Sequence, residues 1–222
     1  MQEIETNLPS LELESITIKG FKSFKSIEKL PLKAINMVIG PNGSGKSNFI
    51  GAFSFLNAIR EAKLQEYVAK AGGAEKVLHY GSNVTHAIDL PLTFHGEANQ
   101  YRIKLMPSPG DQLMPSDKVY FWDKKQYPER PYGETLTSYG REAGISNPNC
   151  TRTANYVRNH LARMRLYHFH DTSPASPLKK TNSLNDNRFL RSDGSNLAAF
   201  LYLLREKYKS SYGLIRGAVQ RV

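Results

Sequence analysis

The N-terminal third of the chain carries two apolar patterns on either side of a turn. In residues 11–18 (LELESITI) the apolar side chains fall near alternate positions with a break in the middle, which predicts a β-strand with a bulge. The stretch GFKSF at 20–24 predicts a turn. Residues 35–39 (INMVI) are almost continuously apolar and end at a glycine, which is typical of a strand buried on both faces.

A long amphipathic helix is predicted after the glycine-rich loop. From Lys46 to about Lys70 there is no proline, and apolar side chains recur at helical spacing. The pair Gly72-Gly73 is expected to end this helix. The predicted order is therefore strand, tight loop, helix.

The middle of the chain changes to short β-rich runs. Residues 86–94, 100–106 and 118–122 predict two or three antiparallel strands, separated by prolines and a glycine. Residues 126–150 are rich in turn-forming residues and predict an irregular surface loop.

The C-terminal part is predicted to be mainly helical. Helices are expected at 153–163, 196–207 and from 211 onward, and a strand at 166–169. The polar, proline-containing stretch 171–188 predicts an exposed loop. We thus expect three regions, namely a nucleotide-binding core at about 11–72, a β-rich insertion at about 84–125 and a helical part at about 151–222.

Composition places the chain among ordinary globular proteins. Of its 222 residues 40% are hydrophobic and 23% are charged, and no apolar stretch is long enough for a transmembrane helix. The acidic N-terminus does not resemble a secretory signal, and Cys150 is the only cysteine, so we expect a cytoplasmic protein without membrane association. The formal charge of +10 favours polyanionic partners such as nucleic acid, although the basic residues are dispersed along the chain.

The strongest chemical signal is the loop Gly40–Ser47. It reads GPNGSGKS and fits the phosphate-binding pattern G-x-x-x-x-G-K-[ST] at every fixed position. Its glycines let backbone N–H groups turn toward phosphate oxygens, and the following helix adds the positive end of its dipole. Lys46 can reach the β- and γ-phosphates, and the Ser47 hydroxyl can ligate Mg²⁺. The predicted binding residues are Gly40, Pro41, Asn42, Gly43, Ser44, Gly45, Lys46 and Ser47.

Three weaker candidates have simpler explanations. His168, His170 and Asp171 could form a metal site, but a partly buried polar strand end is the preferred interpretation. Leu166–Asp171 could also be a magnesium-coordinating strand, but its interior histidines and tyrosine argue against this, because magnesium-coordinating strands are normally apolar. The stretch 192–195 (SDGS) faintly resembles a signature loop of ABC ATPases, but a helix N-terminal cap followed by an amphipathic helix is the preferred interpretation. The aromatic run 120–122 is interpreted as core or hairpin packing rather than as a base-stacking platform.

Residues 16–60 resemble a known family. The stretches ITIKGFKSFKSI and INMVIGPNGSGKSNFIGAFSFL are similar to the N-terminal ATPase segment of SMC- and RecF-like proteins, within the ABC-type ATPases. Asn48 after the loop serine is characteristic of that branch. The later stretches YHFHDTSP and LRSDGSNLAAFLYLL resemble bacterial RecF-like proteins described as AAA family ATPases.

The resemblance implies a fold and several roles. It implies an α/β P-loop NTPase fold, here the N-terminal lobe of an ABC-type head with mixed or antiparallel strands. It implies ATP and Mg²⁺ as ligands, with Asn48 and Lys22 near the nucleotide and Gln112 as one possible glutamine-loop residue. In such proteins ATP joins two heads into a dimer, and the relatives act in DNA maintenance, repair or genome defence.

The chain also departs from the family pattern. After Gly194 the only acidic residue is Glu206, so no apolar strand ending in Asp-Glu follows the signature-like stretch. We therefore expect the N-terminal portion of a longer ATPase that binds ATP, with Lys46 as its catalytic lysine, but turns it over slowly. Two alternatives stay open, a kinase-like P-loop phosphotransferase and a non-catalytic module that binds nucleotide or nucleic acid.

Overall fold

The chain folds into two compact units, Met1–Met164 and Arg165–Val222. The structure is a computed structural model that describes residues 13–33, 35–126, 128–167, 173 and 175–220. The first unit contains a sheet, four helices and the glycine-rich loop, and the second unit contains two packed helices and the turns that precede them.

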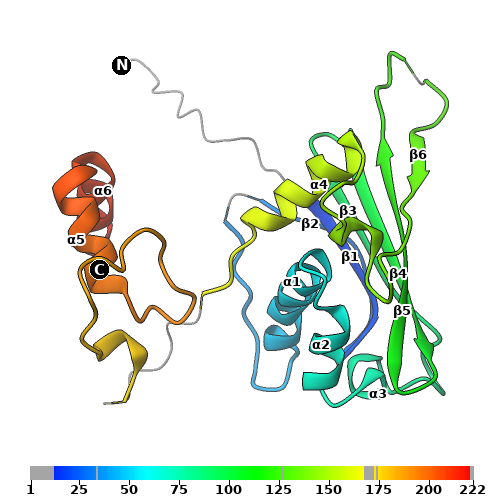
Figure 1. The fold of residues 1–222 in the computed structure, drawn as a ribbon, viewed down its shortest axis with the longest axis horizontal. Coiled ribbons are helices and arrows are strands. Elements are labelled where there is room, and N and C mark those ends of the chain that lie inside the picture. The colour runs from blue at the N-terminus through cyan, green and yellow to red at the C-terminus, as the bar shows by residue number, and fades with distance from the viewer. Residues whose placement is uncertain (1–12, 34, 127, 168–172, 174, 221–222) are drawn as a thin grey trace. The chain divides into compact units, whose positions relative to one another are not determined.

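One antiparallel sheet forms the frame of the first unit (Figure 1). Its six strands lie in the order β2-β1-β3-β4-β5-β6, and every neighbouring pair is antiparallel. Their bounds are β1 (Leu13–Phe21), β2 (Phe24–Pro31), β3 (Ile88–Phe94), β4 (Asn99–Ser108), β5 (Gln112–Phe121) and β6 (Tyr132–Thr135). The expected α/β class with antiparallel strands is confirmed. So is the bulge in the first strand, where the register shifts between Ile16 and Ile18.

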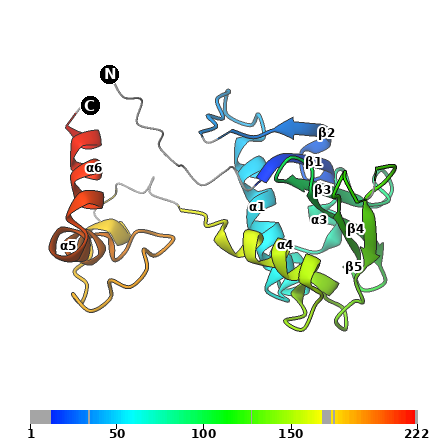
Figure 2. The same cartoon turned by 90° about the horizontal axis from the view of Figure 1, so that it is seen from above.

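Alternating burial along β3, β4 and β5 gives the sheet one apolar face. In β3 the buried positions are Ile88, Leu90, Leu92 and Phe94, and their neighbours in sequence are less buried. Helices cover this face: α1 (Lys46–Arg60), α2 (Leu64–Lys70), α3 (Ala74–Val77) and α4 (Arg152–Arg163), as Figures 1 and 2 show. The Phe21 and Phe55 rings stack between sheet and α1 with their centroids 5.2 Å apart. Period-two burial on strands facing helical stripes is what produces this core.

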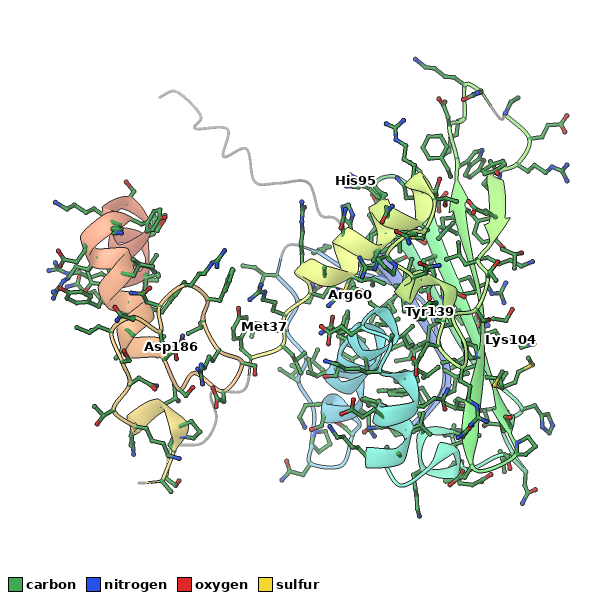
Figure 3. The ribbon with its side chains drawn as sticks, in the orientation of Figure 1. Met37, Arg60, His95, Lys104, Tyr139 and Asp186 are labelled. Carbon is green, nitrogen blue, oxygen red and sulfur yellow. The ribbon has the colours of Figure 1, made fainter. Side chains whose placement is uncertain are left out.

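The opposite face of the sheet is mainly polar, and no helix among the described residues of the first unit covers it. Lys104 on β4 lies on this face, pointing away from the helices (Figure 3). Arg102, on the same face, forms a bidentate pair with Asp89 of the neighbouring strand, with N–O distances of 3.0 and 2.6 Å. An antiparallel sheet commonly keeps one such solvated face.

The helix predicted over 46–70 is in fact two helices. Ala62 takes a left-handed backbone conformation with φ 57°, so α1 ends at Arg60 and α2 begins at Leu64. The Glu142 carboxylate accepts hydrogen bonds from the backbone N–H groups of Leu64 and Gln65 at 2.7 and 3.1 Å. A carboxylate at a helix N-terminus satisfies donors that have no partner within the helix. The predicted end at Gly72-Gly73 is confirmed, since both glycines have positive φ.

The third β-run begins earlier than predicted. β5 starts at Gln112 and passes through Pro115, which pairs with Leu105 of β4. Proline is tolerated in a strand where one side lacks a partner. β6 pairs with β5 only over Lys118–Phe121, so Pro115 stands at such an open side.

The prediction of a surface loop over 126–150 is wrong for part of that stretch. The stretch contains β6 and a short 3-10 helix, η1 (Gly144–Ser146), whose residues are buried. Asp117 of β5, itself fully buried, accepts hydrogen bonds from the N–H groups of Gly144 and Ile145 at 2.9 Å each. The Tyr101 hydroxyl donates to the same carboxylate at 3.1 Å. The two backbone donors attach the segment to the sheet, and Tyr101 of β4 holds the carboxylate that accepts them.

Asp117→Ala is expected to destabilise the first unit by about 2–4 kcal/mol, because buried donors would lose their acceptor. Burial raises the pKa of the Asp117 carboxyl, so its ionised form costs more in the folded chain than in the unfolded chain. The group's contribution to stability is therefore largest below the unfolded pKa of about 3.9 and falls as the pH rises through the folded pKa.

Urea denaturation of wild type and variant on both sides of that pH window tests this expectation. Equal stability of wild type and variant, or a difference that grows as the pH rises through the window, would contradict it.

The largest correction concerns residues 35–39, which were expected to form a buried strand. The described residues of this segment form no strand, and the exposed fractions of Ile35, Met37, Val38 and Ile39 are 84%, 83%, 44% and 86%. The reason is topological: β2 and β3 already flank β1 on both sides, and no strand described here pairs with the segment. An apolar run is buried on both faces only when strands and covering layers surround it.

The second unit is built around α5 (Leu197–Lys207) and α6 (Lys209–Val219), which pack on each other. The buried Asn196 holds the turn before α5: its side chain accepts from Arg191 N and donates to the carbonyls of Asp186 and Phe189, each at 2.8 Å. The predicted helices at 196–207 and from 211 onward are confirmed, as is the helix at 153–163 in the first unit. The described part of the predicted loop 171–188 consists of turns and one short 3-10 helix, η2 (Pro177–Lys179).

Candidate functional site

The glycine-rich loop leads directly into the N-terminus of α1. Gly43 and Gly45 have φ of 83° and 93°, a region that side chains with a Cβ rarely adopt, so the loop's shape requires glycine at both positions. Gly45 is the N-cap of α1, and no side chain caps the helix. Its first-turn N–H groups are thus a potential anion site, as at many helix N-termini that bind phosphate.

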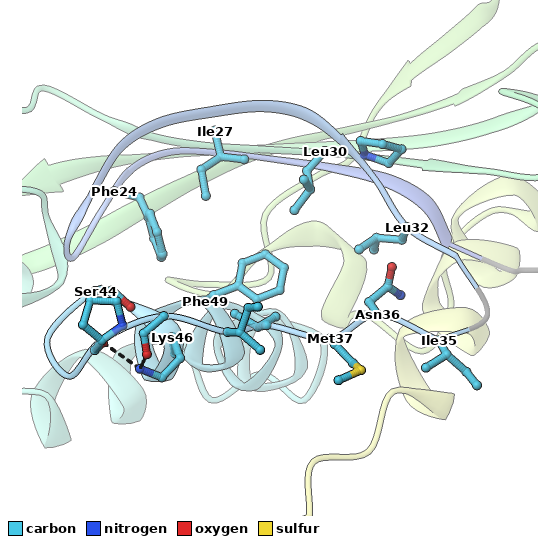
Figure 4. Close-up of a pocket in the computed structure, with 16 residues that line it drawn as sticks. Phe24, Ile27, Leu30, Leu32, Ile35, Asn36, Met37, Ser44, Lys46 and Phe49 are labelled. Atoms are coloured by element: carbon cyan, nitrogen blue, oxygen red, sulfur yellow. Dashed lines mark hydrogen bonds between the residues drawn. The ribbon is translucent and has the colours of Figure 1, made fainter.

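Lys46 folds back over the loop (Figure 4). Its Nζ donates to the carbonyl oxygens of Gly40 and Pro41, each at 2.7 Å. The two carbonyls accept from two of the three N–H donors of the ammonium group. Phosphate oxygens are stronger acceptors for this cation than neutral carbonyls, so an arriving polyphosphate can replace them.

A small cavity of about 220 Å³ lies at the mouth of the loop. Its lining consists of Asn42, Gly43, Gly45, Lys46, Ser47 and Asn48. Six of the ten residues predicted to bind nucleotide therefore meet at one cavity, and the exposed Ser47 hydroxyl stands beside Lys46 in sequence. No carboxylate is among the lining residues.

A larger and mainly apolar pocket of about 690 Å³ adjoins this cavity and shares Gly45 and Lys46 with it. Side chains of β2 and of α1 line it together with the exposed segment 35–39 (Figure 4). Sequence reasoning missed this pocket, because it assigned residues 35–39 to the interior of a sheet. The loop cavity and the apolar pocket therefore form two adjoining parts of one surface.

Lys22 lies in the turn between β1 and β2. Its Nζ is 5.5 and 5.6 Å from the ring centroids of Phe21 and Tyr67, and 3.9 Å from the position of a Cβ on Gly51. The side chain thus runs along α1, and Lys22 is not among the residues that line the loop cavity. The prediction that it approaches a bound nucleotide stays a prediction.

The other candidates lie elsewhere. Gln112 begins β5, where its Oε1 accepts from Arg141 at 2.9 Å. In the signature-like stretch, Asp193 Oδ1 accepts from Ser195 N at 3.0 Å, and Asn196, the residue after the stretch, is the N-cap of α5. The stretch therefore forms a turn just before α5, and no side chain caps this helix.

The aromatic and histidine candidates give no second site. Tyr120 faces Gly133 of β6, where an added Cβ would come within 2.8 Å of the ring, which favours packing within the hairpin. His168, His170 and Asp171 lie outside the described residues, as does part of the strand predicted at 166–169. Within the part of the chain that the structure describes, no three His, Cys, Asp or Glu side chains gather as metal ligands. No helix in that part is both long and apolar enough to cross a membrane.

Comparison with known proteins matches the same segment that carries the loop. Residues 12–107 match the family described as "RecF/RecN/SMC N terminal domain". The chain is 39% identical over 79 residues to "Chromosome partition protein Smc" of Desulfitobacterium hafniense, which is 35% of this chain and 6% of that protein. It is 39% identical over 72 residues to the protein of the same name from Mycobacterium tuberculosis, covering 32% of this chain and 6% of that relative.

A eukaryotic relative matches as well. "Structural maintenance of chromosomes protein 1" of Arabidopsis thaliana is 40% identical over 58 residues, 26% of this chain and 5% of the relative. The match to this chain thus spans about one-twentieth of the length of such relatives. The predicted resemblance to the N-terminal portion of SMC- and RecF-like proteins is confirmed.

Proposed function

Since residues 12–107 match the N-terminal domain of RecF, RecN and SMC proteins, we propose that this chain is the ATP-binding portion of an SMC- or RecF-like ATPase. The single observation that carries the proposal is the complete phosphate-binding pattern of Gly40–Ser47 at the N-terminus of α1, with Lys46 beside the loop cavity. The fold class alone would not support it, because one fold hosts many activities.

Each residue of the loop has a role in this proposal. The N–H groups near Gly43, Gly45 and Lys46 bind phosphate oxygens, and the α1 dipole adds attraction for negative charge. Lys46 leaves its two carbonyl acceptors and pairs with the β- and γ-phosphates. The Ser47 hydroxyl ligates Mg²⁺, and the ion, when bound, neutralises charge between these phosphates.

Hydrolysis makes further demands that the loop cavity does not meet. Phosphoryl transfer to water needs groups that hold the metal and orient the nucleophile. The cavity is lined by glycines, amides, a serine and a lysine, and no carboxylate is among them. We therefore propose that the 222-residue chain binds ATP and turns it over slowly.

The relatives suggest a wider setting. Their printed names refer to chromosome partition and to structural maintenance of chromosomes. We propose that the whole protein acts on DNA and that ATP pairs two heads. Light scattering with and without Mg·ATP tests the pairing, and DNA binding that weakens as salt rises tests the contact with nucleic acid. A mass that ATP leaves unchanged in the protein containing both P-loop and signature elements would argue against pairing.

The nucleotide site is tested by equilibrium binding of a fluorescent ATP analogue with and without Mg²⁺. Wild type is expected to bind more tightly with the ion. Ser47→Ala is expected to lose about tenfold in affinity when Mg²⁺ is present and little when it is absent, because the hydroxyl acts through the ion.

Ser116→Ala, on the polar face of the sheet, is the matched control and is expected to bind like wild type. Phosphate release from ATP in the same samples is expected to stay near background. Rapid release that depends on Lys46 would contradict the proposal of slow turnover, and Mg²⁺ dependence that survives in Ser47→Ala would remove Ser47 from the metal site.

A further inference from the structure

The β1–β2 turn is tied to the first turn of α1 by one side-chain hydrogen bond. Asn48, the third residue of α1, donates from its Nδ2 to Ser23 Oγ at 2.9 Å. The two residues are 25 positions apart in sequence. Asparagine near a helix N-terminus commonly bonds to its own backbone. Here its side chain instead reaches a different element.

The same turn also packs against the loop itself. A Cβ added to Gly45 would lie 3.0 Å from Ser23 Oγ and 3.2 Å from Phe24 Cζ. The turn therefore contacts the chain at Gly45 and again at Asn48. These two contacts bracket Lys46 and Ser47, which both line the loop cavity.

The turn is held in place on its other side. Lys22 has φ 48°, an unfavourable region for a residue with a side chain, and such conformations persist where the surroundings fix them. Its N–H donates to Val77 O at 2.8 Å, and its carbonyl is hydrogen-bonded by His79 Nδ1 at 2.8 Å. Val77 is the last residue of α3 and His79 follows that helix, and both are buried, so the turn is anchored to the core.

We propose that Ser23 is a positioning residue for the nucleotide loop. Its contacts with Asn48 and Gly45 hold the start of α1 against the anchored β1–β2 turn. The N–H groups of residues 45–47 are thereby kept in the orientation that binds phosphate. Preorganised donors bind a ligand more tightly than mobile ones, because less conformational entropy is lost on binding. The proposal deepens the ATP-binding function and rests on it.

A double-mutant cycle tests this role. Ser23→Ala and Asn48→Ala are each expected to weaken Mg·ATP binding by about three- to tenfold, the range for loss of one hydrogen bond. The double variant is expected to be no weaker than the weaker single variant, because both remove the same bond. Ser23→Thr keeps the hydroxyl and is expected to restore most of the affinity. Ser26→Ala, exposed on β2, is the matched control and is expected to bind like wild type.

Amide hydrogen exchange without nucleotide gives a readout that does not depend on ATP binding. Residues 45–49 are expected to exchange faster in Ser23→Ala and Asn48→Ala, with the sheet amides unchanged. If wild type binds no ATP, the ATP-binding function fails, and the exchange result still decides whether Ser23 positions the loop. Wild-type exchange rates in both variants, or affinity losses that simply add in the double variant, would overturn the proposal.

Discussion

Lys46→Ala is expected to weaken Mg·ATP binding by about 10- to 100-fold, because a charge-assisted contact contributes about 1.5–3 kcal/mol. The Lys46 ammonium donates to the Gly40 and Pro41 carbonyls of its own loop. Its replacement therefore removes a cation from the site without removing a contact between elements of the core. The free energy of unfolding is expected to change by less than about 1 kcal/mol.

Lys104→Ala is the matched control for Lys46→Ala. It removes the same charge from the polar face of the sheet, where Lys104 is exposed on β4. If general electrostatic attraction drove binding, both variants would weaken it equally and added salt would abolish the difference from wild type. Isothermal titration calorimetry with Mg·ATP measures the affinity of both lysine variants. Equal affinities of Lys46→Ala and wild type would contradict the assignment of the loop.

Ile18→Ala is expected to destabilise the first unit by about 2–5 kcal/mol, whereas Ile39→Ala is expected to change its stability by less than about 0.5 kcal/mol. Both are isoleucines in segments that the sequence pattern assigns to strands. Ile18 is fully buried in β1, and Ile39 is 86% exposed. The cost of a deleted side chain depends on the cavity that it leaves, and an exposed position leaves none.

Urea denaturation of the two isoleucine variants, followed by far-ultraviolet circular dichroism, measures this contrast. The slope of the denaturation curve is expected to be the same in both, since the surface exposed on unfolding is nearly unchanged. A loss of several kcal/mol in Ile39→Ala would mean that residues 35–39 are buried in solution. Such a result would restore the buried strand that the apolar pattern predicts.

The elements read correctly from sequence are those set by local chemistry. The alternating apolar positions of β1 and β3, the N-terminus of α1 after Gly45, and the glycine stop at Gly72-Gly73 each depend on residues close in the chain. The loop pattern also locates the site, because its glycines specify backbone geometry directly. Nearby residues are enough to define such features.

The failures arise where distant residues decide the outcome. Residues 35–39 have the composition of a buried strand but lack neighbouring strands among the residues described. The start of α2 is hydrogen-bonded to the Glu142 carboxylate, and η1 is hydrogen-bonded to Asp117. A single sequence contains no pattern that predicts hydrogen bonds between residues so far apart in the chain.

The coupling of Ser23 to Asn48 was also missed. Ser23 stands in the stretch GFKSF, which predicts a turn, and Asn48 follows the loop serine in GKSN. Each residue alone is ordinary in a turn or in a first helical turn. The two side chains meet only in the folded chain, where the turn between β1 and β2 lies beside the start of α1. There Asn48 Nδ2 and Ser23 Oγ are 2.9 Å apart.

We propose Gly40–Ser47 as the site of Mg·ATP binding. The most direct test is a nuclear magnetic resonance titration of the isotope-labelled chain, following the backbone amides. We predict saturable shifts confined to the loop and first turn of α1, above all at Gly43, Gly45, Lys46 and Ser47, and their loss in Lys46→Ala. Saturable shifts that leave these amides unmoved, or no shifts at all in a folded wild-type chain, would contradict the account.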